Sequence, residues 1–234
     1  MRRRMYKAIV FDIGRTLIGY NKPLNWSSLY RPALEHISNE CNYHLTEHQY
    51  RAAIDVLTKY NTRVNPREHE VSSAEIFSEI TNAIGVSVNE LEKVKHVYYT
   101  FFRRDFMVYP EVEFTLAELS KRGILLGTLS DVAYGMDNQY VFDDISTLKQ
   151  YIDYPYTSND IGYRKPNIAG IKFLAGKMNI EISEMIFVGD EEKDMICANN
   201  AGAYSILINR DAQHKEYGQQ KEIKSLAELL SIID

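Results

Sequence analysis

The sequence predicts an α/β fold, in which a Rossmann-like parallel sheet carries an inserted all-helical domain. Short apolar runs, typical of buried strands, occur near the start of the chain and again in its second half. In that second half they alternate with helical patterns, which implies right-handed crossovers and a parallel sheet. Between the first run and the later ones lies a long stretch with helical patterning throughout. This stretch is too long to be a loop, so we expect a separate inserted domain.

The first predicted strand covers residues 8–11 and ends at Asp12. The helical stretch that follows, residues 27–104, has a predicted break at residues 60–65 and a predicted helix end at Gly85. Three segments in it have the capping-box form that begins helices: Thr46-x-x-Gln49, Ser72-x-x-Glu75 and Ser87-x-x-Glu90. Together these signals predict about four helices.

Strands and helices alternate after Pro110. The predicted order is helix 111–122, strand 124–129, a helical or loop region 134–150, strand 154–157, helix 167–178, strand 185–188, helix 194–201, strand 205–208 and helix 225–233. We therefore predict a sheet domain of residues 1–18 and 108–234 and a helical cap of residues 19–107. The hinges are expected at residues 18–23 and 106–110, which places the cap over the carboxyl edge of the sheet.

The composition is that of a soluble globular protein, with 45% hydrophobic and 25% charged residues in a chain of 234. A net charge of −5 argues against nucleic acid as a partner, because phosphate binding requires a basic surface. Two cysteines are too few for a disulfide framework or a zinc site. The basic start, Arg2 to Arg4, precedes an apolar run too short for a signal peptide or a membrane span. We expect a cytoplasmic protein without a membrane partner; the oligomeric state is not indicated.

Two carboxylates follow strands that are far apart in the sequence. Asp12 comes directly after residues 8–11, and Asp190 directly after residues 185–189. The carboxyl ends of parallel strands meet at one edge of a sheet, where ligands bind. Two carboxylates brought together there repel each other unless a positive charge lies between them. Because oxygen ligands suit it, Mg²⁺ is the predicted cofactor.

Three further residues are expected at the same edge, each suited to chemistry on a phosphoryl group. Ser130, in GTLSD, follows the strand 124–129, Lys165 lies in GYRKP, and Asp194 lies in GDEEKD. A carboxylate such as Asp12 can attack phosphorus and form a covalent intermediate. Lys165 supplies positive charge for that attack, and Ser130 can hold phosphoryl oxygens by hydrogen bonds. Asp194, one helical turn after Asp190, can orient Lys165 or a water on the metal.

In this order the four segments resemble the haloacid dehalogenase superfamily, most of whose members are Mg²⁺-dependent phosphohydrolases. The resemblance covers residues 7–17 and 110–209, and the helical insert is similar to the family's helical cap class. The resemblance implies that Asp12 is the nucleophile and a metal ligand, and that Gly14 is a further metal ligand through its carbonyl. It implies that Thr16 supports the nucleophile loop and that Ser130 and Lys165 bind the phosphoryl group. It also implies that Asp190 is the acidic metal ligand, with Asp194 as its neighbour. The implied substrate is a small phosphorylated metabolite.

Gly14 is the departure from the family pattern. Family phosphatases carry an aspartate at this position, which is the general acid for the leaving group and then the base for water. Gly14 can do neither, and such assistance is typically worth about 10² to 10⁴-fold. Turnover should therefore survive for acidic leaving groups, as in acyl or aryl phosphates, and suffer for alkyl monoesters.

Three alternatives to a phosphatase follow from this departure. A dehalogenase uses no metal and would leave Asp190 and Asp194 crowded against Asp12. A phosphonatase needs a cap lysine that forms a Schiff base, for which Lys22 and Lys59 are candidates by position only. The third alternative, from another class, is a catalytically weakened protein that binds a phosphorylated ligand or a protein partner.

Arg15 and Asp131 are further candidates for substrate binding. For Arg15, contact with solvent or the cap is the favoured interpretation over contact with phosphate. For Asp131, a loop carboxylate with its own partners is favoured over a proton carrier. Elsewhere, Trp26 is a candidate for the mouth of the site, and solvent exposure is favoured for Arg103 and Arg104. Core packing is predicted for the cap aromatics Tyr98, Tyr99, Phe101 and Phe102.

Overall fold

The computed structural model describes residues 6–21, 25–103, 106–211 and 213–233. Its centre is a six-stranded, wholly parallel sheet in the order β5-β4-β1-β6-β7-β8, so the predicted fold class is confirmed. The strands are β1 (Ala8–Phe11), β4 (Leu125–Ser130), β5 (Tyr154–Thr157), β6 (Met185–Gly189), β7 (Tyr204–Ile208) and β8 (Lys221–Ile223). The edge strand β8 was not predicted, because two of its three residues are exposed and it has no apolar run.

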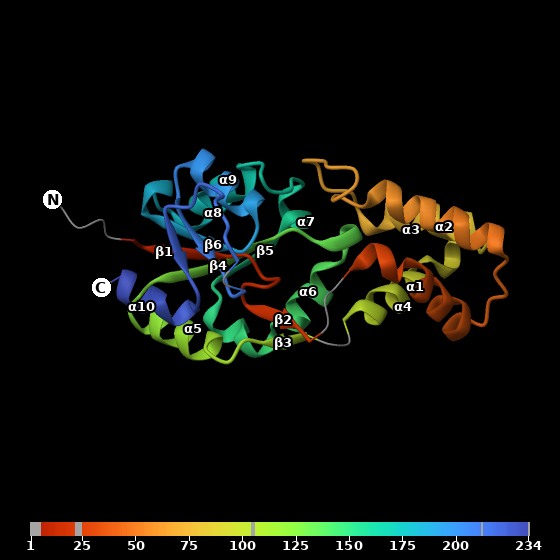
Figure 1. Ribbon diagram of the computed structural model, residues 1–234, viewed down its shortest axis with the longest axis horizontal. Coiled ribbons are helices and arrows are strands. Elements are labelled where there is room, and N and C mark those ends of the chain that lie inside the picture. The colour runs from red at the N-terminus through yellow and green to blue at the C-terminus, as the bar shows by residue number, and fades with distance from the viewer. Residues whose placement is uncertain (1–5, 22–24, 104–105, 212, 234) are drawn as a thin grey trace.

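Helices cover both faces of the sheet (Figure 1). On one side lie α5 (Val112–Lys121), η3 (Ser146–Tyr151), η5 (Leu226–Glu228) and α10 (Leu229–Ile232); on the other lie α8 (Ala169–Met178) and α9 (Glu192–Ala201). The central strand β1 is apolar along its whole length because it is buried on both faces: Ile9 and Phe11 pack on the first side, Ala8 and Val10 on the second. Among the described helices, none has the length and apolar character that crossing a bilayer requires.

A helical insert, residues 26–102, forms the other end of the molecule (Figure 1). It consists of α1 (Trp26–Cys41), α2 (Glu47–Tyr60), α3 (Ser73–Ile84), the short η1 (Val88–Glu90) and α4 (Leu91–Phe102), as the sequence predicted. The capping box at the start of α2 is formed in both directions between Thr46 and Gln49. Tyr98 and Tyr99 are fully buried and Phe102 nearly so, while Phe101 packs against the same cluster, which confirms their prediction as core residues.

An antiparallel hairpin joins the sheet to the helical insert. It pairs β2 (Ile18–Tyr20) with β3 (Phe106–Val108), where the chain enters and leaves the insert. The sequence predicted hinges here but no strands, because three residues are too few to show a strand pattern. Parts of both hinges, with the candidates Lys22 and Arg104, lie outside the described residues.

A segment that follows β4 completes the apolar core of the helical insert. It contains η2 (Ala133–Gly135) and the start of α6 (Asn138–Asp144), and Tyr134 and Tyr140 are buried against α4 and α1. The Tyr99 hydroxyl donates to the carbonyl of Tyr134 at 2.8 Å. The predicted boundaries assign this segment to the sheet domain; its packing therefore ties the two parts together, and the boundaries themselves remain a prediction.

Candidate active site

The strand order brings Asp12, Ser130 and Asp190 to one edge of the sheet. Because β1 lies between β4 and β6, the residues at and just after their carboxyl ends are neighbours. The Asp12 N–H donates to the carbonyl of Val188 at 2.9 Å, which fixes the start of the loop after β1 against β6. Three residues predicted from separate segments therefore meet as expected.

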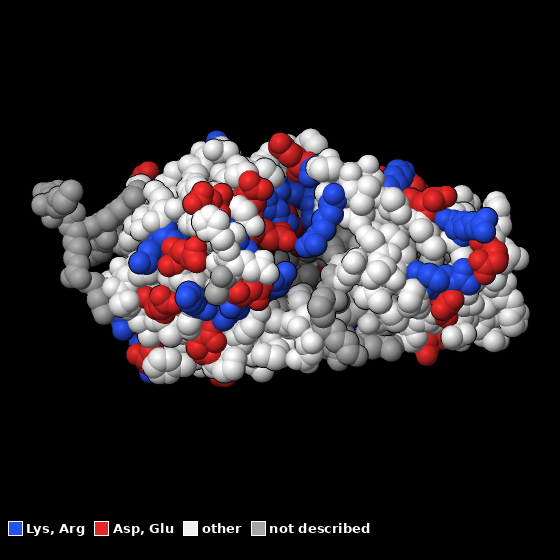
Figure 2. All heavy atoms as spheres, in the orientation of Figure 1, with Lys and Arg blue, Asp and Glu red and all other residues white. Residues whose placement is uncertain are grey.

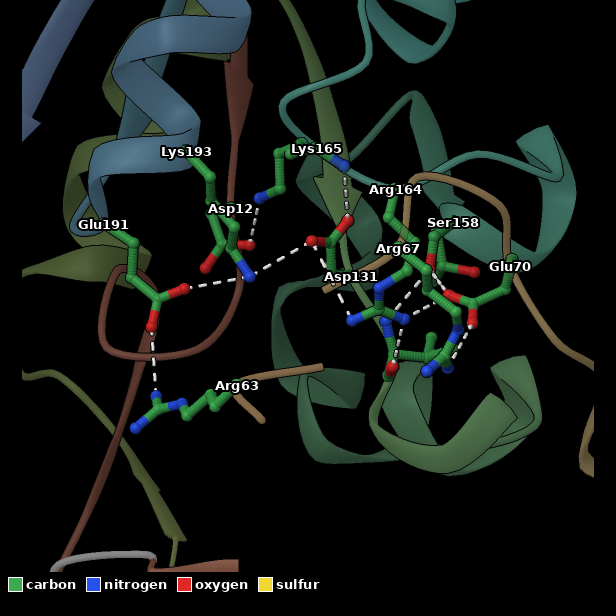
Figure 3. A network of polar contacts seen from close by, with 12 residues as sticks. Asp12, Arg63, Arg67, Glu70, Asp131, Ser158, Arg164, Lys165, Glu191 and Lys193 are labelled. Atoms are coloured by element: carbon green, nitrogen blue, oxygen red, sulfur yellow. Dashed lines mark hydrogen bonds and ion pairs between the residues drawn. The ribbon is translucent and has the colours of Figure 1, made fainter. Parts of the chain in front are cut away.

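Lys165 lies between two carboxylates (Figure 3). Its Nζ is 2.7 Å from Oδ1 of Asp12 and 2.7 Å from Oδ1 of Asp194. The other oxygen of Asp194 accepts the Glu191 N–H at 3.0 Å. Gly189 makes this arrangement possible, because a Cβ at that position would lie 2.3 Å from the Asp194 carboxylate. Asp194 is thus positioned to hold Lys165 in place.

Three buried carboxylates form a group that a divalent cation fits. One oxygen atom from each of Asp12, Asp190 and Asp194 lies within 4.8 Å of the others. These are hard oxygen ligands of the kind that Mg²⁺ prefers. Both oxygens of Asp194 have partners, Lys165 and the Glu191 N–H, so the residues that would hold the ion are Asp12 and Asp190, with the Gly14 carbonyl as the further predicted ligand.

The charge of the group is not balanced by the chain alone. Burial, only partly offset by Lys165, raises the pKa of Asp12 to about 6. Burial and the neighbouring Asp12 raise the pKa of Asp190 to about 8. Burial opposes the charge of Lys165, but Asp12 and Asp194 outweigh it and raise the Lys165 pKa well above its usual value. Lys165 contacts two of the three carboxylates, and the half-exposed Arg15 reaches Asp190 only at 3.5 Å. The pKa values of Asp12 and Asp190 stay raised despite these cations, which is a second reason why a divalent cation fits.

The raised pKa values predict how the metal-free protein responds to pH. Asp12 and Asp190 ionise near pH 3.8 in the unfolded chain but near 6 and 8 in the folded protein. The folded state therefore binds more protons between these values, and its stability falls as pH rises from about 4 to 8, on the order of 1 kcal/mol per pH unit. Urea midpoints in EDTA at pH 5 to 8 measure this fall.

Asp190→Asn is the control for this prediction. The substitution removes the group with the larger shift, so the midpoint in EDTA should depend less on pH than it does in the wild type. Added Mg²⁺ should stabilise the wild type more at pH 8 than at pH 5. A wild-type midpoint that stays level or rises over this range would contradict the prediction.

Arg15 lies against acids of the sheet domain. Its Nη2 is 2.7 Å from Asp211 and its Nε is 3.5 Å from Asp190, and its side chain is 54% exposed. The residue has a left-handed backbone, with φ of 58°. Arg15 is therefore next to the predicted metal ligand Asp190 while remaining open to solvent.

Asp131 is surrounded by positive groups. It accepts the Lys165 N–H at 3.0 Å and pairs with Lys193 Nζ at 3.0 Å, and Arg164 lies 3.9 Å away (Figure 3). Burial opposes its ionisation, but Lys165, Lys193 and Arg164 together lower the Asp131 pKa. Asp131 is therefore a loop carboxylate with three positive neighbours, and a contact with substrate stays a prediction.

Thr16, in the loop after Asp12, is bound to Arg210 through its backbone. Its carbonyl accepts from Arg210 at 2.8 Å, and the residue is fully buried. Its hydroxyl, by contrast, has no hydrogen-bond partner among the described residues. The predicted supporting role therefore depends on the backbone contact with Arg210.

The sequence did not single out the charged residues at the mouth of the site. Lys193 pairs with Glu191 at 2.9 Å, and Arg63, from the loop after α2, reaches Glu191 at 3.1 Å (Figure 3). With Lys215 and Asp190 they line an open pocket of about 520 Å³. Figure 2 shows charged side chains gathered where the sheet domain meets the helical insert. Of these residues, the sequence could have indicated Lys193, because it lies within GDEEKD between the predicted site residues Asp190 and Asp194.

Residues 68–70 of the helical insert, here called the strap, lie on the loop that carries Lys165. Residues 68–70, between α2 and α3, run antiparallel to residues 162–164 and form a bridge with them. The Arg164 N–H donates to the carbonyl of Glu68 at 2.7 Å. Lys165 is the next residue, so the insert directly contacts the backbone that positions it.

A buried ion pair fastens the strap. The Glu70 carboxylate binds Arg164 and accepts from the Ser158 hydroxyl, and Arg67 lies 3.6 Å away (Figure 3). The side chains of Glu70 and Arg164 are only 3% and 6% exposed. Arg164 also donates to the carbonyl of Val132 at 2.7 Å. The contact therefore combines the helical insert, the Lys165 loop and the segment after β4.

Relatives of the chain are named as phosphatases. A phosphoglycolate phosphatase of Yersinia pestis is 27% identical over 113 residues, which are 47% of this chain and 47% of that protein. The chain thus spans about half the length of the curated phosphoglycolate phosphatases it matches. A glyceraldehyde 3-phosphate phosphatase of Methanothermobacter thermautotrophicus is 24% identical over 218 residues, 91% of this chain and 89% of that protein.

Solved structures share the whole architecture. The 2-haloacid dehalogenase of Pseudomonas syringae is similar with a TM-score of 0.70 over 98% of both chains, at 20% identity. That likeness establishes the fold alone. The protein-family model described as haloacid dehalogenase-like hydrolase matches residues 9–208 of this chain, which include the four segments at the sheet edge. The match covers most of the 234 residues, and the chain belongs to the haloacid dehalogenase-like hydrolase family.

Proposed function

We propose that the protein is a Mg²⁺-dependent phosphatase in which Asp12 is the nucleophile and the substrate is a small phosphorylated metabolite. The observation that carries the proposal is the group of Asp12, Asp190 and Asp194 around Lys165 at the carboxyl edge of the sheet. The phosphatase names of the sequence relatives support it. A cytoplasmic location remains a prediction.

Each residue of the site has its own role in the proposed reaction. Bound at the carboxylates, Mg²⁺ supplies positive charge that favours attack by an anion on a phosphoryl group. An Asp12 oxygen attacks phosphorus as the bond to the leaving oxygen breaks, and water then releases phosphate from the aspartyl intermediate. Lys165 and Ser130 bind phosphoryl oxygens, and Asp194 keeps the Lys165 ammonium pointed at them.

The alternative chemistries receive less support from the site. A metal-free dehalogenase would retain the unbalanced carboxylates whose pKa values are raised. For a phosphonatase, Lys22 lies outside the described residues, and the Lys59 side chain is 58% exposed and pairs with Glu79 at 2.8 Å. That pairing raises the Lys59 pKa, whereas a Schiff-base lysine requires a lowered one.

Phosphate release and intact mass together test the proposed function. The protein is incubated with Mg²⁺ and a panel of acyl, aryl and alkyl phosphates. Steady release that requires Mg²⁺ supports a phosphatase. A phosphoryl adduct on Asp12 that persists supports a stalled enzyme. Ligand binding with neither release nor adduct supports the weakened binding protein that Gly14 suggests.

Gly14→Asp is expected to increase turnover of alkyl phosphates by about 10 to 100-fold, because it restores a proton donor and acceptor. The described residues leave space for the side chain: among them, a Cβ on Gly14 meets the Tyr20 hydroxyl alone, at 3.8 Å, and the backbone is not left-handed. Steady-state kinetics on an alkyl and an aryl phosphate measure the change. Gly14→Asn, similar in shape but unable to transfer the proton, is the control, and an equal gain in both variants would contradict the prediction.

A further inference from the structure

Tyr20 lies beside the position of the missing acid. It ends β2, in the hairpin between the sheet and the helical insert (Figure 1). The nucleophile loop turns back on itself through a bridge between Gly14 and Ile18, which brings β2 close to the loop. The Tyr20 hydroxyl is 3.8 Å from the point that a Cβ on Gly14 would occupy. A side chain at position 14 would therefore extend into the space that this hydroxyl borders.

The Tyr20 hydroxyl is a donor without a partner. The buried hydroxyls of Tyr30 and Tyr99 are hydrogen-bonded, to Asn61 and to the carbonyl of Tyr134, whereas that of Tyr98 has no partner among the described residues but lies in the core of the helical insert. For Tyr20 the structure shows no hydrogen bond to any described residue, although the side chain is mostly buried. Buried donors normally have a partner, so an unpaired one next to a nucleophile is available to a ligand.

The surroundings keep Tyr20 protonated. Burial, followed by the charges of Asp144, Asp12 and Asp190, raises the pKa of Tyr20 well above its usual value. The negative charges of the proposed nucleophile Asp12 and of the predicted metal ligand Asp190 both act on the phenol. At neutral pH the group is therefore a neutral phenol that donates a hydrogen bond.

We propose that the Tyr20 hydroxyl donates a hydrogen bond to the oxygen that leaves phosphorus when Asp12 attacks. The inference rests on the proposed function and adds a catalytic residue to it. Attack is in line, so the leaving oxygen is on the side of phosphorus opposite Asp12. The family acid at position 14 serves this oxygen, and the Tyr20 hydroxyl lies 3.8 Å from where a Cβ at that position would be.

The step balances without a further reactant. The bond between Asp12 and phosphorus forms, the bond between phosphorus and the leaving oxygen breaks, and the electron pair stays on that oxygen. The phenol stabilises the developing charge and keeps its proton, while water protonates the departing alcohol. Because more charge develops on a poorer leaving group, the hydrogen bond matters most for alkyl esters. It therefore extends the substrate range beyond the acidic leaving groups to which Gly14 alone would limit the enzyme.

Tyr20→Phe tests the inference, because it removes the hydroxyl and preserves the ring. Turnover with Mg²⁺ is compared for acetyl phosphate, 4-nitrophenyl phosphate and glycerol phosphate. We expect kcat to fall by about 10² to 10³-fold on the alkyl ester, the size of effect seen when one donor to a developing oxyanion is lost. We expect a loss of no more than about fivefold on the two acidic leaving groups.

Two further variants complete the experiment. Tyr204→Phe removes a hydroxyl at the amino end of β7, at the opposite edge of the sheet, and should leave all three rates unchanged. Tyr20→Phe combined with Gly14→Asp should regain most of the activity on the alkyl ester, because the carboxyl group fills the same space. This recovery also shows that the Tyr20→Phe protein folds.

Each outcome of these measurements supports or contradicts the proposed role of Tyr20. A loss that grows with the basicity of the leaving group supports it. An equal loss on all three substrates, or no loss, overturns it while the proposed function stands. A wild type that releases no phosphate from any ester overturns the proposed function and the role of Tyr20 with it.

Discussion

Asp12→Asn is expected to lower kcat for phosphate release by at least about 10⁴-fold. An amide nitrogen or oxygen is a poor nucleophile, and the covalent path through the carboxylate is closed. The substitution also removes one of the two carboxylates that would hold Mg²⁺. Phosphate release from 4-nitrophenyl phosphate, followed at saturating substrate, measures the loss.

The same substitution should leave the metal-free fold at least as stable as the wild type. Asp12 is a buried carboxylate whose pKa is raised to about 6, so its charged form is unfavourable there. Without it, Lys165 keeps its ion pair with Asp194 at 2.7 Å. Removing strained catalytic groups commonly stabilises a protein at the expense of activity. Thermal melts in EDTA should show an equal or higher midpoint, and added Mg²⁺ should raise it less than in the wild type.

Asp55→Asn, on the exposed side of α2, is the matched control and should change neither activity nor melting. Residual activity above about 1% of wild type in Asp12→Asn would contradict the assignment of Asp12 as the nucleophile. A large fall in the melting temperature would instead show that Asp12 is required for folding. The two readouts therefore separate a chemical role from a structural one.

The sheet was predictable because its strands are buried on both faces. Residues 8–11 and 185–189 are continuous apolar runs for that reason, and each ends in the aspartate that the topology brings to the site. The hairpin of β2 and β3 was not predictable. Its strands have three residues each, and they pair across the whole helical insert, so no local pattern marks them.

The candidate site, like the fold, contains residues that the sequence indicated and residues that it did not. Asp12, Asp190 and Lys165 follow or adjoin elements with clear sequence patterns, and the structure brings them together. Tyr20 and Glu70 were missed because their importance comes from contacts with distant residues. Nothing adjacent in the sequence indicates that Tyr20 borders Gly14 or that Glu70 meets Arg164.

The buried ion pair of Glu70 and Arg164 should dominate the attachment of the helical insert. Glu70→Ala removes the carboxylate in direct contact with Arg164, which is only 6% exposed and is left with Asp131 at 3.9 Å, and Arg67 loses the same neighbour. Breaking a buried pair by removing one partner typically costs about 3 to 5 kcal/mol. We expect the free energy of unfolding, measured by urea denaturation, to fall by about this amount.

Two variants make this prediction specific. Glu70→Gln retains the shape and an acceptor for Arg164 and Ser158, so it should cost less than Glu70→Ala. Glu35→Ala removes a carboxylate from an exposed pair with Arg31 on the same insert and should cost less than about 1 kcal/mol. A cost for Glu70→Ala as small as that of Glu35→Ala would mean that Arg164 finds water or another partner.

Activity measurements on Glu70→Ala connect the strap with catalysis. Residues 68–70 hold the backbone of residues 162–164, and Lys165 follows immediately. If the strap loosens, the Lys165 ammonium loses its fixed position, and the KM for a phosphate ester should rise even where the protein remains folded. An unchanged KM in a folded, destabilised variant would show that Asp12 and Asp194 alone are enough to position Lys165. The helical insert would then contribute stability without setting the geometry of phosphate binding.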